Sequence, residues 1–417
     1  MAKHFTPTEW AAINAGLDAA PDRYGWPEHR SGSLILSSFN IRKLGDVDNK
    51  TDGAFDLIAR FIAQCDLIAV QEVLEDLSAL KHVVALASNI AGEPFEFIAS
   101  DITGGRGATG SSVERLAFVY RKSRVTQGNV AADLSFDRGY ILDELYDKRA
   151  DFIAAADAYA AEYAEKRTAY EAKAAAAAAA GKRKPSFRKP IFVAPAFLDF
   201  IRTPHVVSFD IGGGANPYRI MAVNAHLLYG DKSKQAEERK REFEALLTWL
   251  LIRAAKHKSE YQDFILLGDL NLSFSKPEIQ RPLIHARIKT LNAELKRSRA
   301  ATVVNFPFID ERVSPRTGDV SVIRTNARLT ETFDQIGVFA HDKRLPSFEE
   351  NEDVADPARS DDAFDYQVFD FASLFSDTLV GEDFADRPKK ERSAFINRYH
   401  HDFSDHMPIW IRLPQPT

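Results

Sequence analysis

The pattern of apolar and polar positions is clearest near the middle of the chain, in residues 264–272, Phe-Ile-Leu-Leu-Gly-Asp-Leu-Asn-Leu. Four consecutive apolar residues are typical of a strand that is buried on both faces. Asp269 and Asn271 follow two positions apart, so both side chains should lie on one side of the chain, with Leu270 turned into the core. The carboxyl end of such a strand is where an α/β sheet usually presents its functional groups.

Similar apolar runs alternate with helical patterns along the rest of the chain. The patterns predict strands at 34–40, 67–72, 95–99, 115–120, 218–226, 333–339 and 407–411, and helices at 7–17, 52–64, 77–91 and 233–256. Alternating strands and helices, with strands of mixed character, indicate a large α/β core. At 417 residues, such a core could form one large domain or two smaller ones.

Two segments look like insertions into this core. Residues 143–181 contain almost no Gly or Pro and are rich in Ala, Glu, Lys and Tyr, a composition that strongly favours helix. A basic cluster follows, so 143–189 is expected to be a helical arm with a basic tip. Either the arm is simply solvated, or it helps to hold a polyanion. The second segment, 342–396, is acidic and rich in Phe, and is expected to be an excursion with one or two helices. The basic residues of the tip are Lys182, Arg183, Lys184, Arg188 and Lys189.

Composition narrows the function classes. The chain has 54 basic and 60 acidic residues and a net charge of −6, which argues against a passive nucleic-acid coat but not against an enzyme. Its single cysteine, Cys65, cannot form an intramolecular disulfide, which suits a reducing compartment. The first residues lack the apolar core of a secretory signal, and no stretch approaches the ~18 apolar residues of a membrane span. A soluble, cytoplasmic protein without a membrane partner is expected.

Polar residues adjoin the ends of most predicted strands, and their types fit one reaction. Each alone has an ordinary explanation, since an Asn at a strand end is usually a turn former. Together, carboxylate and amide oxygens without Cys ligands favour Mg²⁺ or Mn²⁺. Two histidines with carboxylates available match in-line attack of water on a phosphodiester, with one imidazole activating water and the other serving the leaving side. The strand-end residues are Asn40, Glu72, Asn224, His226, Asp269, Asn271 and Asp334, with Asp405 and His406 just before the last strand.

Seven stretches occur in the order found in the endonuclease/exonuclease/phosphatase superfamily, and the chain resembles its deoxyribonuclease I branch. Gly-Asp-Leu-Asn at 268–271, followed near the C-terminus by Ser-Asp-His at 404–406, is the most specific combination. The resemblance implies a four-layer α/β sandwich, two packed mixed β-sheets flanked by helices, as a single domain over 1–417 that carries both insertions. The other stretches are 38–42, 69–73, 114–121, 224–226 and 332–334.

The resemblance also implies a role for each site residue. Asn40, Glu72 and Asp405 would bind the metal ion. His406 would be the water-activating base, held by Asp334, and His226 would lie across the phosphate, oriented by Glu114. The remaining residues would contact phosphate, nucleophile or substrate; they are Asp269 and Asn271, and the substrate-binding residues Arg42, Asn224 and Arg202.

Substrate identity is less strongly indicated. Leu74 and Ser112 stand where deoxyribonuclease I carries a groove-inserting Arg and a Tyr, which leaves minor-groove reading in doubt. We expect a metal-dependent phosphodiesterase that acts on nucleic acid, on DNA in preference to RNA, as an endonuclease. The alternatives are a phosphatase or lipid phosphodiesterase of the same superfamily, and a non-catalytic protein-binding scaffold.

Overall fold

The computed structural model describes residues 4–104, 113–134, 138–190, 192–230, 233–254, 260–272, 303–355, 363–382 and 386–416, together with a few single positions between them. Ser112 and parts of the predicted helix at 233–256 and of the excursion at 342–396 lie outside these residues.

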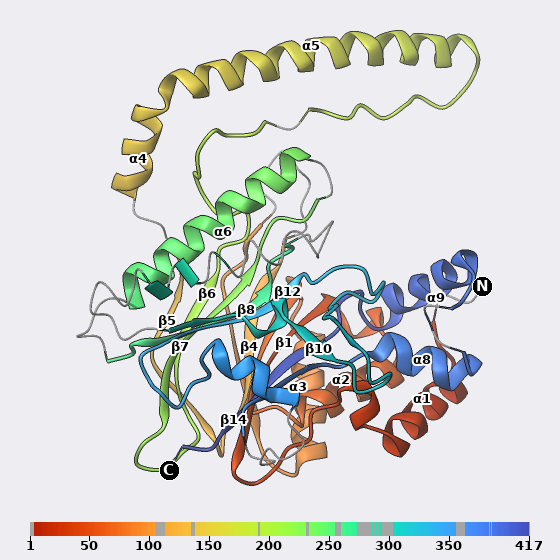
Figure 1. Ribbon diagram of the computed structural model, residues 1–417. Helices are drawn as coiled ribbons and strands as arrows, with labels where there is room; N and C mark the ends of the chain where they lie inside the picture. Colours follow the sequence, from red (N-terminus) through yellow and green to blue (C-terminus); the bar gives the residue numbers. More distant parts are fainter. Residues whose placement is uncertain are drawn as a thin grey trace.

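Two six-stranded mixed sheets dominate the structure (Figure 1). In the first sheet, β1 and β2 are parallel and the other neighbours are antiparallel. Its strand order is β13-β14-β1-β2-β4-β3. The strands are β1 (Ser33–Leu44), β2 (Leu67–Val73), β3 (Phe95–Ala99), β4 (Arg115–Arg121), β13 (Asp365–Val368) and β14 (Ile409–Pro414).

The second sheet has the order β5-β6-β7-β8-β12-β9, in which β7 and β8 are parallel and the other neighbours antiparallel. A separate hairpin pairs β10 (Glu311–Val313) with β11 (Val320–Val322). The strands of the second sheet are β5 (Val125–Asp133), β6 (His205–Ile211), β7 (Tyr218–His226), β8 (Asp263–Asp269), β9 (Val303–Asn305) and β12 (Asp334–Ala340).

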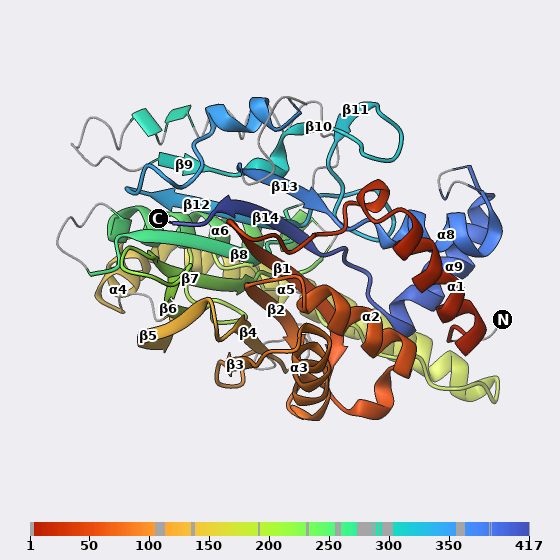
Figure 2. The same cartoon turned by 90° about the horizontal axis from the view of Figure 1, so that it is seen from below.

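Helices cover the outer faces of both sheets. Figure 1 shows α6 on the side of the second sheet and α1, α2, α3, α8 and α9 on the side of the first, while Figure 2 shows α1, α8 and α9 gathered at one end of the molecule with the N-terminus. The helices of the core are α1 (Pro7–Ala19), α2 (Asp52–Ile62), α3 (Ser78–Ala91), α6 (Ser233–Ala254), α8 (Phe371–Val380) and α9 (Lys389–Asp402). Short 3₁₀ helices occur at η1 (Asp22–Tyr24), η2 (Val47–Asn49), η3 (Pro307–Ile309) and η4 (Glu349–Ala355).

Three hydrophobic clusters correspond to the three interfaces between the four layers. Along β1, Leu34 and Leu36 belong to the cluster between the two sheets, whereas Ile35 belongs to the cluster between the first sheet and its helices. This alternation is the period of two expected of a strand covered on both faces, and it explains why β1 is apolar at nearly every position. The third cluster joins the second sheet to α6. The four-layer α/β sandwich predicted from the sequence is confirmed.

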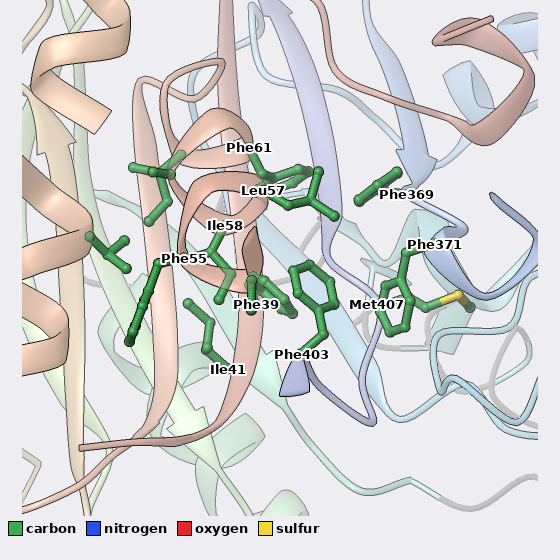
Figure 3. Packing of buried hydrophobic residues seen from close by; sticks show 14 of the residues in the cluster. Phe39, Ile41, Phe55, Leu57, Ile58, Phe61, Phe369, Phe371, Phe403 and Met407 are labelled. Atoms are coloured by element: carbon green, nitrogen blue, oxygen red, sulfur yellow. The ribbon is translucent and has the colours of Figure 1, made fainter. Parts of the chain in front are cut away.

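Aromatic rings fill the outer cluster of the first sheet (Figure 3). Phe371 of α8 meets Phe403 edge-to-face with 4.8 Å between ring centroids, and Phe39 of β1 lies 5.8 Å from Phe403. Edge-to-face pairs add about 0.5–1.5 kcal/mol beyond the burial of their area. Because Phe403 immediately precedes the Ser-Asp-His stretch at 404–406, this packing fixes the segment that carries His406.

The sequence patterns located most elements but missed the buried strand β6 as well as several short or exposed strands. β5 is largely exposed along its length, so its sequence, Val-Thr-Gln-Gly-Asn-Val-Ala-Ala-Asp, carries no burial pattern. The last strand begins at Ile409 instead of 407, because Pro408 supplies no backbone N–H to the sheet. The acidic segment contains β13 as well as α8 and most of α9. None of the described helices is long and apolar enough to cross a membrane.

The arm is inserted between β5 and β6. It consists of α4 (Arg138–Asp147) and α5 (Arg149–Ala179), followed by an extended return limb, and α5 is helical as its composition predicts. None of the 31 residues of α5 is buried, and the helix stands clear of the body in Figure 1.

We predict that Gly268→Ala destabilises the fold by more than Gly92→Ala. Gly268 has φ +153° and pairs with Ala225 of β7, and a Cβ there would meet the Ala225 carbonyl oxygen at 1.9 Å. Gly92 also has positive φ, +69°, but a Cβ there meets nothing within 4 Å. Conformational strain alone costs about 1 kcal/mol, and the steric clash should add to it at Gly268. Urea denaturation of both variants measures the difference; equal losses would contradict the prediction.

Candidate active site

Strand register brings three of the predicted residues into one row. His226 at the end of β7 is in register with Asp269 at the end of the parallel strand β8. Asp334, the first residue of antiparallel β12, is opposite Asp269 on the other side. The sheet therefore places His226, Asp269 and Asp334 side by side at one edge. His406 is added from the loop before β14, where its backbone pairs with Asn326.

Five buried side chains form a continuous alternation of carboxylates and imidazoles. The Nδ1 of His226 is 2.6 Å from Glu114 Oε1, and its Nε2 is 3.4 Å from Asp269 Oδ2. The Nε2 of His406 is 3.5 Å from the same Asp269 oxygen, and its Nδ1 is 2.9 Å from Asp334 Oδ2. We call this series, from Glu114 through His226, Asp269 and His406 to Asp334, the relay. Each imidazole lies between two carboxylates, so Nδ1 of each ring is held by its own acid and Nε2 faces the shared one.

The relay makes both histidines stronger bases than ordinary imidazoles. Burial opposes the charged form of His406, but the carboxylates of Asp334 and Asp269 outweigh it and raise the pKa of His406 well above its usual value. For His226, burial and the Arg202 guanidinium lower the pKa, while Glu114 and Asp269 raise it, and the net shift is upward. Burial likewise opposes ionisation of Asp269, yet the two neighbouring histidines lower its pKa. The central carboxylate is thus ionised between two rings that favour protonation.

Asp269, Asp334 and His406 also offer ligand atoms within 4.8 Å of one another, the one such buried group among the described residues. Both ring nitrogens of His406 already face carboxylates. Asp334 accepts a further hydrogen bond of 2.7 Å from the Thr325 hydroxyl. With these atoms engaged, we interpret the group as part of a proton-transfer network, and we place the metal-binding atoms elsewhere.

Oxygen atoms suited to a hard cation lie beside the relay. Asn40 donates from Nδ2 to Asp269 Oδ2 at 3.1 Å and to Glu72 Oε1 at 3.4 Å, which leaves its Oδ1 buried without a hydrogen-bond partner among the described residues. Asp405 Oδ1 is also buried without a partner there. Glu72 has φ +57°, an uncommon value for a residue with a side chain. Buried oxygens without hydrogen-bond partners, next to a residue with a strained backbone, indicate a position adapted to a ligand.

Asn271 is held in a second strained position. Its φ is +50°, its backbone N–H donates to Asp269 Oδ1 at 2.9 Å, and its Nδ2 donates to the Leu227 carbonyl at 3.1 Å. The side-chain Oδ1 is buried without a partner in the described structure. The turn therefore fixes the Asp269 carboxylate while leaving an amide oxygen available at the surface of the cleft.

The two predicted arginines differ in what they contact. Arg202 is buried, with its Nε 3.1 Å from Glu114 Oε2, and it donates from Nη1 to the Leu227 carbonyl at 3.2 Å. Arg42 donates from Nη1 to the His400 carbonyl, and its Nε is 3.6 Å from Asp405 Oδ2. Arg202 lines the cleft described below, whereas Arg42 is not among the residues that line it and contacts the 400–405 segment.

Asn224 is not in the site. Its Nδ2 donates to the carbonyls of Val70 (3.1 Å) and Ala117 (2.9 Å) in the first sheet, and its Oδ1 accepts from Gln71 Nε2 at 2.7 Å. The side chain is fully buried with its amide satisfied, so the predicted substrate contact is corrected to an inter-sheet bridge. Asn224 and His226 lie on the same face of β7. That face is open to solvent at the strand end, where His226 lies, but it is covered by the first sheet at Asn224.

A cleft of about 490 Å³ opens over the relay and is lined by predicted and unpredicted residues. Glu72, Arg202, His226, Asp269, Asn271, Asp405 and His406 all reach it. The other lining residues were not predicted as site residues. They come from loops, from α9 and, for Phe333, from the position just before β12; they are Tyr229, Asn326, Arg328, Thr330, Glu331, Phe333 and His400.

Two further buried residues of α6 support the site, and a helical pattern could have located them. Arg239 and Glu242 are spaced with Leu246 and Leu250 along one face of the helix. The Glu242 carboxylate accepts from the backbone N–H groups of Ile201 (2.8 Å) and Leu228 (2.9 Å). Burial raises its pKa to about 7 against the lowering effect of those two N–H groups. Glu242 therefore ties the segment carrying Arg202 to the segment that follows His226.

Known proteins share part of this sequence. Deoxyribonuclease-1 of Gallus gallus is 35% identical over 99 residues, which are 23% of this chain and 33% of that protein. Deoxyribonuclease-1 of Oryctolagus cuniculus is 30% identical over 97 residues, again 23% of this chain and 33% of that protein. The matched segment thus spans a third of these relatives. No family model matches the chain.

Several solved structures are similar at low identity. A humanized D. rerio TDP2 with 14 mutations has 12% identity and a TM-score of 0.38, covering 92% of this chain and 99% of that one. Truncated Caenorhabditis elegans TDP2 has 12% identity and a TM-score of 0.41, covering 92% and 97%. An endonuclease/exonuclease/phosphatase family protein of Bacteroides thetaiotaomicron has 12% identity and a TM-score of 0.39, covering 93% and 96%.

The chain folds as a two-sheet sandwich, and its candidate site pairs histidines with carboxylates at one sheet edge. With the local similarity to deoxyribonuclease-1, the chain resembles the deoxyribonuclease I-like branch of the endonuclease/exonuclease/phosphatase superfamily.

We predict that Asp334→Asn lowers the pKa of His406. The substitution removes the charge that favours the imidazolium form, so the His406 titration should move to lower pH by about 1–3 units. Histidine ¹H–¹⁵N NMR over a pH series measures the midpoint. Asp133→Asn is the matched control, because Asp133 pairs with His205 at 2.9 Å outside the site. An unchanged His406 midpoint in Asp334→Asn, or an equal shift in the control, would contradict the assignment.

Proposed function

We propose that this protein is a divalent-metal-dependent phosphodiesterase that cleaves DNA internally. The single observation that carries the proposal is the relay: two imidazoles, each held by its own acid, converge on one ionised carboxylate at the floor of an open cleft. The local similarity to deoxyribonuclease-1 supports DNA as the substrate. We further propose that residues 1–417 act as one cytoplasmic catalytic domain, to which residues 143–189 add an arm and residues 342–396 an excursion.

The relay divides proton transfer between its two ends. In its neutral form, His406 accepts a proton from the attacking water, and Asp334 stabilises the imidazolium that results. The water oxygen forms a bond to phosphorus as the bond to the leaving oxygen breaks. Protonated His226 gives a proton to that leaving oxygen, and Glu114 holds the ring in position. Asp269 keeps both Nε2 atoms directed at the same space, and Arg202 contributes positive charge beside the phosphate.

A divalent cation fits the oxygen atoms next to the relay. Asn40 Oδ1 and Asp405 Oδ1 are buried without partners in the described structure, and the Glu72 carboxylate lies beside Asn40. Amide and carboxylate oxygens without sulfur ligands favour Mg²⁺ or Mn²⁺. Bound by these three residues, the cation would supply charge neutralisation at the phosphate.

We predict that His226→Ala and His406→Ala each reduce nicking of supercoiled plasmid by at least about 100-fold, because each removes a proton-transfer group. Agarose-gel nicking rates with Mg²⁺ measure the effect, and circular dichroism checks that the fold is retained. His205→Gln alters a buried histidine–carboxylate pair outside the site and should retain activity. Full nicking by either alanine variant would refute the mechanism.

We predict that Asn40→Ala and Glu72→Gln raise the Mg²⁺ concentration required for half-maximal nicking by about 10-fold or more, because each removes an oxygen from the proposed site. Excess chelator should abolish wild-type activity. Glu75→Gln, an exposed carboxylate just beyond β2, is the control and should leave the Mg²⁺ requirement unchanged.

Plasmid, RNA and a phosphoinositide assayed side by side with Mg²⁺ test the substrate assignment. Cleavage of plasmid with little turnover of the other two is expected. Preferential turnover of the phosphoinositide would replace DNA by a lipid substrate, and activity on none of them, with binding to a partner protein, would favour the scaffold alternative.

A further inference from the structure

The base of the arm is part of the candidate active site. The described part of the return limb, residues 181–190 and 192–204, includes Arg202, whose Nε is 3.1 Å from Glu114 of the relay. The preceding residue, Ile201, donates its backbone N–H to Glu242, and Thr203 donates to the Thr103 hydroxyl at 2.6 Å. Three attachments therefore fix this end of the limb at the cleft.

The arm is long, and its two limbs are held together. At about 1.5 Å per residue, the 31 residues of α5 extend about 46 Å. Aromatic contacts join the return limb to the middle of the helix: Phe192 meets Tyr159 at 5.9 Å between ring centroids, and Phe187 meets Tyr163 at 5.5 Å and Tyr170 at 5.2 Å. The guanidinium of Arg167 lies over Phe187 at 5.5 Å. These contacts account for a helix that stands away from the body without burying a residue.

The tip of the arm is structured as well. At the end of α5, Gly181 has φ +63°, and the backbone N–H groups of Gly181 and Lys182 donate to the carbonyls of Ala178 (3.1 Å) and Ala177 (2.8 Å). This glycine-terminated helix end reverses the chain at a defined point. The basic residues that follow are consequently presented at a fixed end of the arm.

Charge is concentrated at this tip. Residues 182–189 include five basic side chains and no acidic one, in a chain whose net charge is −6. All five are exposed, and none forms an ion pair with the described residues. In contrast, Lys166 and Arg167 of the helix pair with Glu162 and Glu171. The largest concentration of basic residues without an ion pair in the arm is therefore at residues 182–189, directly after the end of α5. Figures 1 and 2 show the arm reaching the end of the molecule at which α9 lies.

We propose that the arm holds the flanking part of a double-stranded DNA substrate, with the basic tip contacting backbone phosphates. This inference rests on the proposed function and specifies its substrate as a long duplex. Five exposed cations that form no ion pair with the described residues complement a phosphate backbone, and such contacts supply sequence-independent affinity. A stiff arm suits a stiff duplex, whose persistence length is about 50 nm, better than a flexible single strand. With base pairs about 3.4 Å apart, the arm reaches over about 13 base pairs.

Binding should therefore depend on the tip only when the duplex is long enough to reach it. The tip variant combines Lys182→Gln, Arg183→Gln, Lys184→Gln, Arg188→Gln and Lys189→Gln. The control combines five exposed substitutions scattered over the body, with the same change in net charge: Lys81→Gln, Lys122→Gln, Arg219→Gln, Lys240→Gln and Lys343→Gln. Both are made in the His406→Ala background, and Kd is measured by fluorescence anisotropy for duplexes of 12 and 40 base pairs over a series of salt concentrations.

The tip variant should bind the 40-base-pair duplex about 10–100-fold more weakly than its parent. The slope of log Kd against log salt should fall by about two to four, since each lost phosphate contact removes about 0.9 from it. Its affinity for the 12-base-pair duplex should change by less than about threefold. An unchanged Kd and slope for the long duplex, or an equal loss in the control, would overturn the inference. An equal loss for a 40-nucleotide single strand or for polyphosphate would overturn the assignment to duplex DNA.

Hydrolysis by the wild-type chain is measured in parallel. If plasmid is nicked but the tip variant binds duplex DNA as tightly as its parent, the inference about the arm is wrong and the proposed function is retained. If tip-dependent duplex binding is found without hydrolysis of DNA, the proposed function fails while the arm inference stands.

Discussion

The candidate site depends on one buried carboxylate shared by two histidines. Asp269 Oδ2 lies within 3.5 Å of Nε2 of both His226 and His406. Isolated in the interior, this charge would be costly, and each imidazole would resist protonation. Together they stabilise one another, with Asn40 and the backbone N–H of Asn271 completing the hydrogen bonds of Asp269. The strained backbone of Asn271 and the glycine at position 268 both follow from holding the Asp269 carboxylate in this position.

The convergence of the site residues could be predicted because it follows from strand ends. Parallel pairing of β7 with β8 brings His226 to Asp269, and the antiparallel β12 starts at Asp334, so residues far apart in sequence meet at one edge. Apolar runs locate such ends reliably when strands are covered on both faces. The four layers were implied by the family resemblance, and the alternation along β1 is consistent with cover on each side of the first sheet.

The sequence could not predict how deeply each strand residue is buried or how the loops are arranged. Asn224 shares a face with His226, yet two residues of strand separate the interior of the sandwich from the cleft, and no sequence pattern records that distance. Arg42 donates to the carbonyl of His400 in α9. The position of α9 depends on long-range aromatic packing, such as that between Phe371 and Phe403. The cleft-lining loop at 326–333 has no periodicity, and β5 is too exposed to show a strand pattern. These features depend on tertiary contacts and not on local propensity.

The strand order of the first sheet also affects when the sheet can be completed during synthesis. β14, at residues 409–414, does not lie at an edge but between β13 and β1, and it follows directly on the loop that holds His406. β1 is synthesised well before β14, so the side of its backbone that pairs with β14 lacks its native partner until β14 emerges. An unpaired apolar strand is prone to aggregation until its partner strand is present. The same delay keeps the relay incomplete, because His406 lies directly before β14 in the sequence.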